Sequence, residues 1–405
     1  MHYQKSERGF SPFNSFIFTS LFYIAVSQLL ISSSFAKTVD VVSLMPPVGV
    51  LGQAPHGFAS EVTALTNGSL EVRVKSMKES GVPLPAMIDQ IDSGKQQVFV
   101  APPETFFIQG APQRFGILLT SGFPFGLNAQ EYLSWYYNAG GQQLIQEIFD
   151  RKTAHANVLV FPLAVSTSEP PGFFTDSIPN DPDKFNNSNI TYRINYLGSK
   201  AMKLAFPDLN MVTTPAGRVP VDDLCTGKIN GTELGTLSLY DIFFFDKFSH
   251  PNGDNIVECG FKHLYLGSWQ QLLLSSWMAI NKTFFESLAP HEQQAIITVA
   301  RAGVSRSLTT DIAKGARVLY KAAEAGVTIH SGLPPKVLDR LREATSDVLN
   351  SESEADSDFA KIVEGMKGFV RHNRPALLYD GVSRQQRFKL LPVWDSDYSV
   401  VEQQE

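Results

Sequence analysis

Residues 39–74 read VDVVSLMPPVGVLGQAPHGFASEVTALTNGSLEVRV, and this stretch decides the fold class. Its first four residues form a strand-like run, and residues 70–74 alternate apolar and polar side chains as a second strand does. Between the two strands, apolar residues at helical spacing over residues 57–65 predict a helix. Residues 83–101 continue with a further helix and a further strand. Such an alternation indicates an α/β architecture with a largely parallel sheet.

The rest of the chain predicts a second α/β unit followed by a helical end. A stretch rich in Pro, Asp, Asn and Ser at residues 170–190 predicts loops, and strands alternate with helices again over residues 193–234. The acidic run at residues 352–358 predicts a solvated link. Apolar residues recur at helical spacing in four C-terminal segments, which are residues 290–304, 308–323, 337–349 and 359–370.

The N-terminus has the pattern of a secretory signal. Lys5 and Arg8 precede an apolar run over residues 16–31, and small residues lead to a cleavage position after Ala36. The run is short for a bilayer span, which needs roughly 20 apolar residues, although an uncleaved membrane anchor remains the alternative. We therefore expect residues 1–36 to be a signal peptide and the mature protein to be exported.

Net charge and cysteine content exclude two broad classes of protein. The 405-residue chain has a formal net charge of −6, so no basic field attracts nucleic acid, and we expect no nucleic-acid partner. Its two cysteines, Cys225 and Cys259, do not have the spacing of a structural zinc site. An oxidising compartment would permit a disulfide between them.

The common catalytic signatures are missing from the sequence. It has no GxSxG nucleophile elbow, and His291-Glu292 lacks the second histidine of a zincin helix. It also has no P-loop and no dinucleotide fingerprint. We therefore expect neither an enzyme nor a catalytic cofactor. A dispersed site stays open as an alternative, because catalytic groups assemble in space rather than in sequence.

Several short motifs, taken in order, resemble one family of binding proteins. They are FPFGLNAQE at residues 123–131, WYYNAGG at 135–141, YRINYLG at 192–198, KINGTE at 228–233 and the segment 269–288. Their order and spacing resemble the substrate-binding subunit of TRAP (tripartite ATP-independent periplasmic) transporters, in the branch that binds 2-keto acids and lactate. No single motif is decisive, and the joint order carries the resemblance.

The resemblance implies a two-lobed type II periplasmic solute-binding fold, α/β in class, with a hinge cleft and long C-terminal helices. The expected divisions are lobe I at residues 37–162 and 260–305, lobe II at 163–259 and 306–345, closing helices at 346–378, and an irregular tail at 379–405.

The resemblance also implies a function. The protein would capture a 2-keto or 2-hydroxy monocarboxylate, such as pyruvate or lactate, and deliver it to the membrane subunits of the transporter. Uptake in this family is driven by an ion gradient. A ligand sensor with the same fold, a periplasmic enzyme with a dispersed site and a structural envelope protein remain alternatives. Some relatives dimerise through their terminal helices, which leaves a homodimer open.

Arg193, in the YRINYLG motif, is the strongest site candidate. In the family, the arginine at this position forms a salt bridge with the ligand carboxylate. A guanidinium is a planar two-pronged donor that matches a carboxylate. The alternative is a surface arginine on an edge strand.

A cation is the second implied feature of the site. The resemblance gives Glu233 a share in holding a metal ion, to which the backbone carbonyl of Leu234 would contribute, although relatives usually carry Trp at that position. Glu169 stands where relatives carry a metal-binding Gln. Two carboxylates in one cleft repel unless a cation or proton intervenes, and hard oxygen ligands suit Ca²⁺ or Na⁺. The alternatives are an exposed Glu233, and a Glu169 that points to solvent or pairs with a basic group.

Aromatic residues are the candidates for the walls of the cleft: Phe173, Tyr196, Trp269, Phe106 and Phe107. As bare aromatics they are more often core residues.

The chain departs from the family at residues 102–107, which lack the tyrosines that relatives carry and so would lose a hydroxyl donor to the ligand. Gln270 and Gln271 stand where relatives have His-Glu, and residues 250–262 resemble an inserted surface loop.

Overall fold

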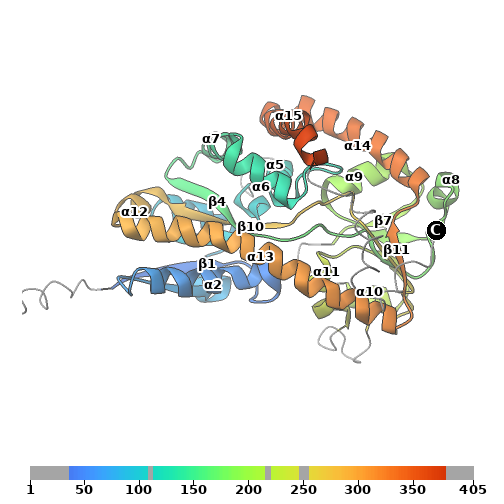
Figure 1. Cartoon of the computed structure of the whole chain (residues 1–405), viewed down its shortest axis with the longest axis horizontal. Helices are drawn as coiled ribbons and strands as arrows, with labels where there is room; N and C mark the ends of the chain where they lie inside the picture. The colour runs from blue at the N-terminus through green and yellow to red at the C-terminus, as the bar shows by residue number, and fades with distance from the viewer. Residues whose placement is uncertain (1–35, 108–112, 215–219, 246–254, 380–405) are drawn as a thin grey trace, which may run out of the picture.

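The computed structural model describes residues 36–107, 113–214, 220–245 and 255–379. Two β-sheets lie side by side along the long axis of the molecule, and the helix α13 (Pro290–Glu324) runs past both of them (Figure 1). The predicted signal peptide and most of the predicted tail lie outside the described residues. Within the described ranges, no helix combines the length and the apolar character that a bilayer crossing needs.

The first sheet carries the strands that the opening stretch predicts. Its order is β2 (Leu70–Ser76), β1 (Lys37–Ser43), β3 (Val98–Ala101), β10 (Ser275–Asn281) and β4 (Val158–Val165). β1 is parallel to β2 and to β3, whereas β10 is antiparallel to both of its neighbours. β3 and β10 are buried along their whole length, as expected for strands covered on both faces.

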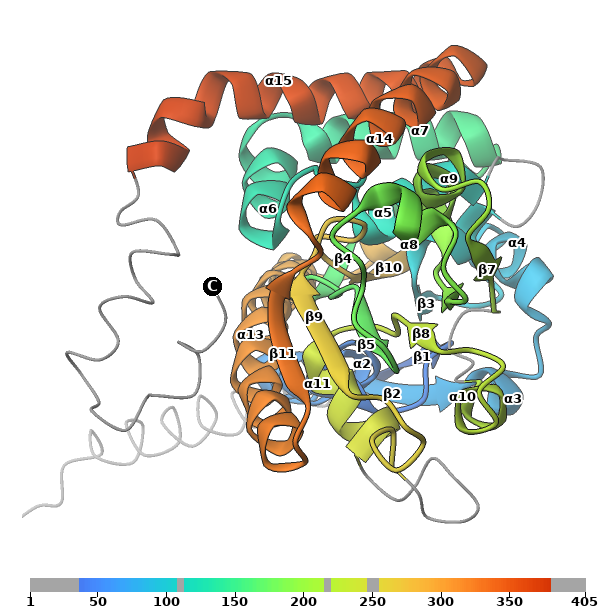
Figure 2. The same ribbon diagram turned by 90° about the vertical axis from the view of Figure 1, so that its right-hand side faces the viewer.

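The second sheet is built from shorter strands. Its order is β11 (Thr328–Gly332), β9 (His263–Gly267), β5 (Gly172–Phe174), β8 (Gly231–Thr232), β6 (Thr191–Arg193) and β7 (Asn210–Val212). Figure 2 looks onto this end of the molecule, with β9 and β11 toward the viewer. β6 is parallel to both β7 and β8, while β5 is antiparallel to β8 and β9. The predicted strand over residues 229–234 is therefore shorter than expected.

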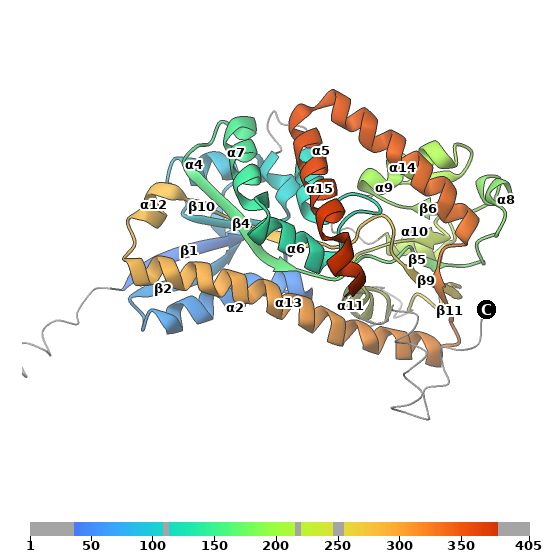
Figure 3. The same cartoon turned by 45° about the horizontal axis from the view of Figure 1, so that its top comes forward.

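Helices complete each half. The first sheet is accompanied by α2 (Gly49–Leu65), α3 (Met77–Ser80), α4 (Met87–Asp92), α5 (Gln113–Ser121), α6 (Ala129–Asn138), α7 (Gly141–Thr153), α12 (Lys282–Glu286) and the 3₁₀ turns η1 (Leu84–Ala86) and η2 (Pro103–Phe107). The second is accompanied by α8 (Pro182–Asn186), α9 (Tyr196–Ala205), α10 (Val221–Cys225), α11 (Leu237–Tyr240) and the π-helical turn η3 (Asp241–Phe245). α14 (Pro335–Ala355) and α15 (Ser357–Tyr379) then return over the molecule (Figure 3).

The prediction of separate helices at residues 290–304 and 308–323 was wrong, because α13 is one helix of 35 residues. Residues 305–307 contain no proline or glycine that would end it. The apolar pattern in the sequence is interrupted because the buried face of the helix changes from apolar to small and polar residues. These include Ser307 and Asp311, where the helix passes between the two sheets. α13 packs against β4 and α2 at one end and against α11 and β11 at the other.

The prediction of a solvated link at residues 352–358 was also wrong. Glu352, Asp356 and Asp358 are all buried. Lys152 Nζ lies 2.9 Å from Asp356 Oδ1 and 3.3 Å from Asp358 Oδ2, so one lysine of α7 holds the α14–α15 junction. Burial would raise the pKa of Asp356, but Lys152 and the N–H groups at the start of α15 keep it below its usual value.

Cys225 and Cys259 form the disulfide that the sequence permitted. The expected surface loop at residues 250–262 is only partly a surface feature. Residues 250–254 lie outside the described ranges, but Ile256 and Phe261 are buried in the core of the second half. The bridge closes a segment that contains Glu233.

The lobe boundaries expected from the sequence remain a prediction. β4 continues to Val165, and α13 passes residues 305 and 306 without a break. Each sheet has its own buried clusters, so each half contains a hydrophobic core.

Candidate functional site

Three chain segments pass between the two sheets. They are residues 166–171, residues 268–274 and the middle of α13. The first two pair with each other through an isolated antiparallel bridge between Glu169 and Gln271, in which the Glu169 N–H donates to the Gln271 carbonyl at 2.9 Å. The Ser268 hydroxyl also donates to the Glu169 carbonyl. This two-stranded ribbon places Glu169 between the halves of the molecule.

Arg193 is the last residue of β6, and Glu233 follows the last residue of β8. Because β6 and β8 are parallel, with Arg193 opposite Thr232, their carboxyl ends meet at the same edge of the sheet. Arg193 Nη1 lies 2.9 Å from Glu233 Oε1 and also donates to the Glu233 carbonyl. Arg193 Nε donates to Thr214 Oγ1 at 3.0 Å. Arg193 is 3% exposed, so the alternative of a surface arginine is wrong.

Backbone contacts fix the second member of the cluster. The N–H of Asn195 donates to Glu233 Oε1 at 2.9 Å, and the Asn195 side chain donates to the Thr214 carbonyl at 3.2 Å. Glu233 is 1% exposed, which also contradicts the reading of an exposed strand-end carboxylate. Its carboxylate is therefore held by a charged group and by a backbone amide.

Glu169 reaches the same cluster from the ribbon. Its side chain accepts from the Gly235 N–H and is 3% exposed, so it does not point to solvent. Burial raises the pKa of Glu169 well above its usual value, and the neighbouring Glu233 raises it further, against the opposing effects of Arg193 and Gly235. The two carboxyl groups are thus close enough that ionising the second is costly.

The cluster of Arg193, Glu169 and Glu233 carries one positive charge against two carboxylates. When both carboxylates are ionised, one negative charge is left without a counter-charge in a buried site, which is expensive unless a proton or a cation balances it. Oxygen donors of this kind fit Ca²⁺ or Na⁺. Within the described ranges, no three or more His, Cys, Asp or Glu side chains converge as a metal site, so a cation here would need ligands besides these carboxylates.

Two buried tyrosines lie close enough to Glu169 and Glu233 for the carboxylate charges to affect their phenols. Burial, and then the charges of Glu169 and Glu233, raise the pKa of Tyr240 well above its usual value, and the pKa of Tyr192 is raised in the same way. The Tyr192 hydroxyl donates to the Pro171 carbonyl at 2.8 Å. Both phenols remain protonated and add no negative charge to the site.

The remaining candidates other than Tyr196 lie in the cores. Phe173 packs against Tyr240 and Phe244, with ring centroids 5.5 Å apart in each case. Trp269 packs against Phe125, and its buried Nε1 has no hydrogen-bond partner among the described residues.

Phe106 and Phe107 belong to the core of the first half, and Leu234 to that of the second. Tyr196 begins α9, but its side chain is outside what the structure describes. Their roles in a cleft stay predictions.

Four groups that organise the site had no role predicted for them from the sequence: Asn195, Thr214, Gly235 and Gln271. The first two follow the parallel strands β6 and β7, which is the signal that could have found them. Gln270 donates to the carbonyls of Glu169 and Pro170 at 3.3 and 3.2 Å. Both polar atoms of the Gln271 amide are buried without a partner among the described residues.

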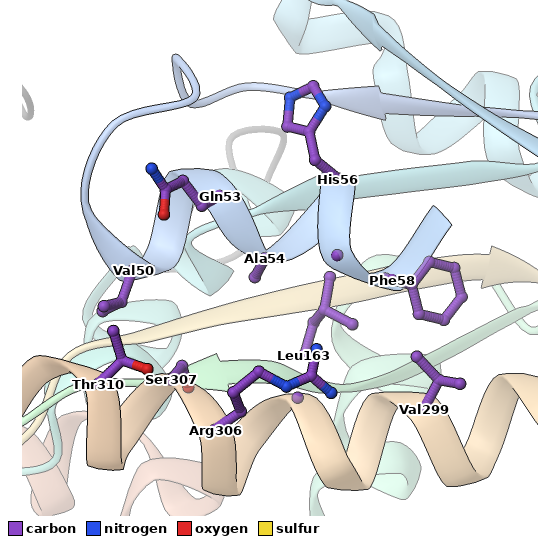
Figure 4. Close-up of a pocket in the computed structure, with 12 residues that line it drawn as sticks. Val50, Gln53, Ala54, His56, Phe58, Leu163, Val299, Arg306, Ser307 and Thr310 are labelled. Atoms are coloured by element: carbon purple, nitrogen blue, oxygen red, sulfur yellow. The ribbon is translucent and has the colours of Figure 1, made fainter. Parts of the chain in front are cut away.

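A pocket of about 380 Å³ lies elsewhere, between α2 and α13, with Leu163 of β4 between the two helices (Figure 4). Its lining contains one guanidinium, Arg306, which is bound to Glu61. His56 points away from α13. The pocket therefore lacks the charge arrangement of the Arg193 cluster, and we do not regard it as the acid-binding site.

No family model matches the chain. A curated monocarboxylate 2-oxoacid-binding periplasmic protein of Nostoc sp. is 22% identical to it over 325 residues, which span 77% of this chain and 78% of that protein. The relative is thus similar over most of its length.

Solved structures show the same architecture. A TRAP periplasmic solute-binding protein of Pseudoalteromonas atlantica, with bound sodium and pyruvate, has a TM-score of 0.69 at 19% identity and covers 87% of this chain and 99% of its own. One from Colwellia psychrerythraea, with bound calcium and pyruvate, has a TM-score of 0.69 at 18% identity, over 85% of this chain and 97% of its own.

A third, from Bordetella bronchiseptica, is a mixed-occupancy dimer with calcium and picolinate in one site. It has a TM-score of 0.68 at 18% identity, over 89% of this chain and 99% of its own. These likenesses confirm the predicted two-lobed solute-binding fold.

Proposed function

We propose that this chain is the periplasmic substrate-binding subunit of a TRAP transporter and captures a small 2-oxo or 2-hydroxy monocarboxylate together with a cation. The observation that carries the proposal is the buried cluster of Arg193, Glu169 and Glu233 between the two halves. A guanidinium in such a place suits an organic anion, and two adjacent carboxylates suit a metal ion. Solved structures that hold pyruvate share the overall fold, and a curated 2-oxoacid-binding protein is similar in sequence over 77% of this chain.

The charge count favours a divalent ion. Arg193 contributes +1, Glu169 and Glu233 contribute −2, and a bound monocarboxylate contributes −1. Ca²⁺ would bring the sum of these charges to zero, whereas Na⁺ would do so only if Glu169 kept a proton. Because uncompensated buried charge is costly, we expect Ca²⁺ to be preferred at neutral pH.

Each group then has a distinct role. The bonds to Glu233 and Thr214 use Nη1 and Nε of Arg193, and the Nη2 edge of the guanidinium is the part that the acid would take. Glu169, Glu233 and the carbonyl of Leu234 would hold the cation. The cation in turn would bind the carboxylate and the 2-oxo or 2-hydroxy oxygen of the acid.

The proposal also states that the protein lies in the periplasm, delivers the acid to membrane subunits and does not convert it to a product. These parts are supported by the N-terminal signal pattern and by the names of the relatives, which are periplasmic binding proteins. α14 and α15 are the helices through which a homodimer would form, as the resemblance allows.

Isothermal titration of the purified protein with pyruvate and with lactate, in CaCl₂, NaCl or EDTA, tests the proposal. We expect binding that is strongest with CaCl₂ and an unchanged acid recovered afterwards. Binding at one hundred times Kd should raise the stability by about 2.7 kcal/mol. Arg193→Lys keeps the charge but loses the planar fork, so it should weaken binding by about tenfold or more. Failure of every small acid to bind, or its conversion to product, would refute the proposal.

A further inference from the structure

A buried carboxylate outside the Arg193 cluster ties three chain segments together. Asp311, in the middle of α13, is 1% exposed. Its Oδ2 accepts from the Thr167 N–H at 2.8 Å and from the Thr167 hydroxyl. Its Oδ1 accepts from the Thr236 hydroxyl at 2.9 Å and from the Ser238 hydroxyl. Each oxygen therefore holds a different segment.

The two segments that Asp311 holds are the ones that carry the paired carboxylates. Thr167 lies two residues before Glu169 on the ribbon between the sheets. Thr236 directly follows Gly235, whose N–H binds Glu169, and lies three residues after Glu233. The carboxylate of Asp311 thus anchors the chain on both sides of the cluster, through one backbone N–H and three hydroxyls, without belonging to the cluster.

Asp311 belongs to a stripe of small and polar residues spaced by four along α13: Gly303, Ser307, Asp311 and Gly315. The Ser307 hydroxyl accepts from the Val165 N–H at 2.9 Å and donates to the Val165 carbonyl at 2.8 Å. Side chains at Gly303 and Gly315 would meet the Leu163 carbonyl at 2.9 Å and the Leu237 side chain at 3.2 Å. The stripe brings α13 against the end of β4 and against α11.

We propose that Asp311 is a positioning residue of the acid-binding site, which sets the separation of Glu169 and Glu233 through Thr167 and Thr236. The inference rests on the function proposed above. Losing the carboxylate would free both segments, so the two carboxyl groups would no longer be held at the spacing that a cation needs. The effect should appear in the affinity for the cation and the acid, because those contacts depend on that spacing.

Two substitutions separate positioning from charge. Asp311→Ala removes all four contacts. Asp311→Asn keeps the shape, and its amide can still accept from the Thr167 N–H while donating to the hydroxyls of Thr236 and Ser238, which can reverse their roles. The matched control is Glu292→Gln, a buried carboxylate at the start of α13 whose partners are Ser69, Ala289 and Lys37, in the first half only.

The measurement is the Kd of pyruvate in CaCl₂ by isothermal titration, with the melting temperature of the metal-free protein beside it. We expect Asp311→Ala to raise Kd about tenfold, which corresponds to about 1.4 kcal/mol. Asp311→Asn should stay within about threefold of the parent, and Glu292→Gln within about twofold even if its melting temperature falls.

The inference is overturned if Asp311→Ala binds like the parent, or if Asp311→Asn is as weak as Asp311→Ala, since an effect of charge alone would treat both alike. Should Asp311→Ala not fold, the double variant Thr236→Val/Ser238→Ala decides, because it removes the Oδ1 contacts and leaves those of Oδ2 in place; unchanged affinity there rejects the proposal. A parent protein that binds no acid contradicts the proposed function instead.

Discussion

At the scale of single residues, the pair Glu169 and Glu233 makes stability depend on pH. Burial and Glu233 raise the pKa of Glu169. In an unfolded chain its value would be about 4.3. Between pH about 4.3 and the raised pKa of Glu169 in the folded state, the folded protein binds more protons than the unfolded chain. Its stability therefore falls as pH rises through this range.

Glu169→Gln should therefore stabilise the metal-free protein at pH 8, by about 1.4 kcal/mol for each unit of the pKa shift removed, while having little effect near pH 4. Its affinity for Ca²⁺ should fall, because one oxygen ligand loses its charge. Urea unfolding in EDTA at several pH values measures the first effect, and calcium titration measures the second.

Glu292 supplies the control of opposite sign. Burial would raise its pKa, but the Ala289 N–H, Ser69 and Lys37 hold it below the usual value. Its contribution to stability is thus present at neutral pH and is lost as pH falls through the folded pKa.

Equal pH dependence of stability in Glu169→Gln and in the parent would show that Glu169 does not hold a proton in the folded state.

The residues of the site were predictable only in part. The family resemblance pointed to Arg193, Glu169 and Glu233, and the structure brings these three side chains together. Asp311 gave no such signal, because a lone aspartate within a helical pattern is normally a solvent-facing residue. Its partner Thr167 lies 144 positions away, a separation that no local pattern reports.

At the scale of elements, the close approach of α13 to β4 predicts the effect of a methyl group. Alanine normally stabilises a helix relative to glycine by about 1 kcal/mol. At Gly303 the added Cβ would lie 2.9 Å from the Leu163 carbonyl, so Gly303→Ala should destabilise the protein instead. Gly368→Ala in α15, where nothing lies within 4 Å, should be stabilising. Urea midpoints of the two variants that shift in the same direction would contradict this packing.

The disulfide is the second element-level feature with a measurable effect. It joins residues separated by 34 positions, and the segment it closes contains Glu233 and α11. The double variant Cys225→Ser/Cys259→Ser should lose about 2–4 kcal/mol of stability and should no longer respond to reductant. Guanidinium unfolding with and without dithiothreitol measures both. If reductant does not change the unfolding of the parent protein, the disulfide does not contribute to its stability.

The sequence predicted elements best where their core face was continuous. The strands β1, β2 and β3 and the helices α14 and α15 follow from apolar periodicity. α13 was divided in two, because the face of Ser307 and Asp311 that meets the ribbon is polar yet buried. The burial of Asp356 does not follow from the local acidic pattern either, because the lysine that pairs with it lies on α7.

At the scale of the whole molecule, the site is closed. Arg193, Glu169 and Glu233 are at most 3% exposed, so an acid can reach them only if the halves move apart at the segments that join them. With EDTA at pH 8, repulsion between the carboxylates opposes closure, whereas pyruvate and Ca²⁺ remove it. Small-angle scattering should therefore give a larger radius of gyration in EDTA than with both ligands. Equal radii under the two conditions would exclude this account.

The order of the strands has a consequence for how the protein is made. β10 lies between β3 and β4 in the first sheet, although β4 and the whole run from β5 to β9 precede it in the chain. A nascent polypeptide emerging from the ribosome cannot close that sheet until Asn281 has been synthesised. The second sheet waits still longer for its edge strand, which ends at Gly332. Both sheets are therefore completed only late in synthesis, so neither half can form its full hydrophobic core until most of the chain has been made.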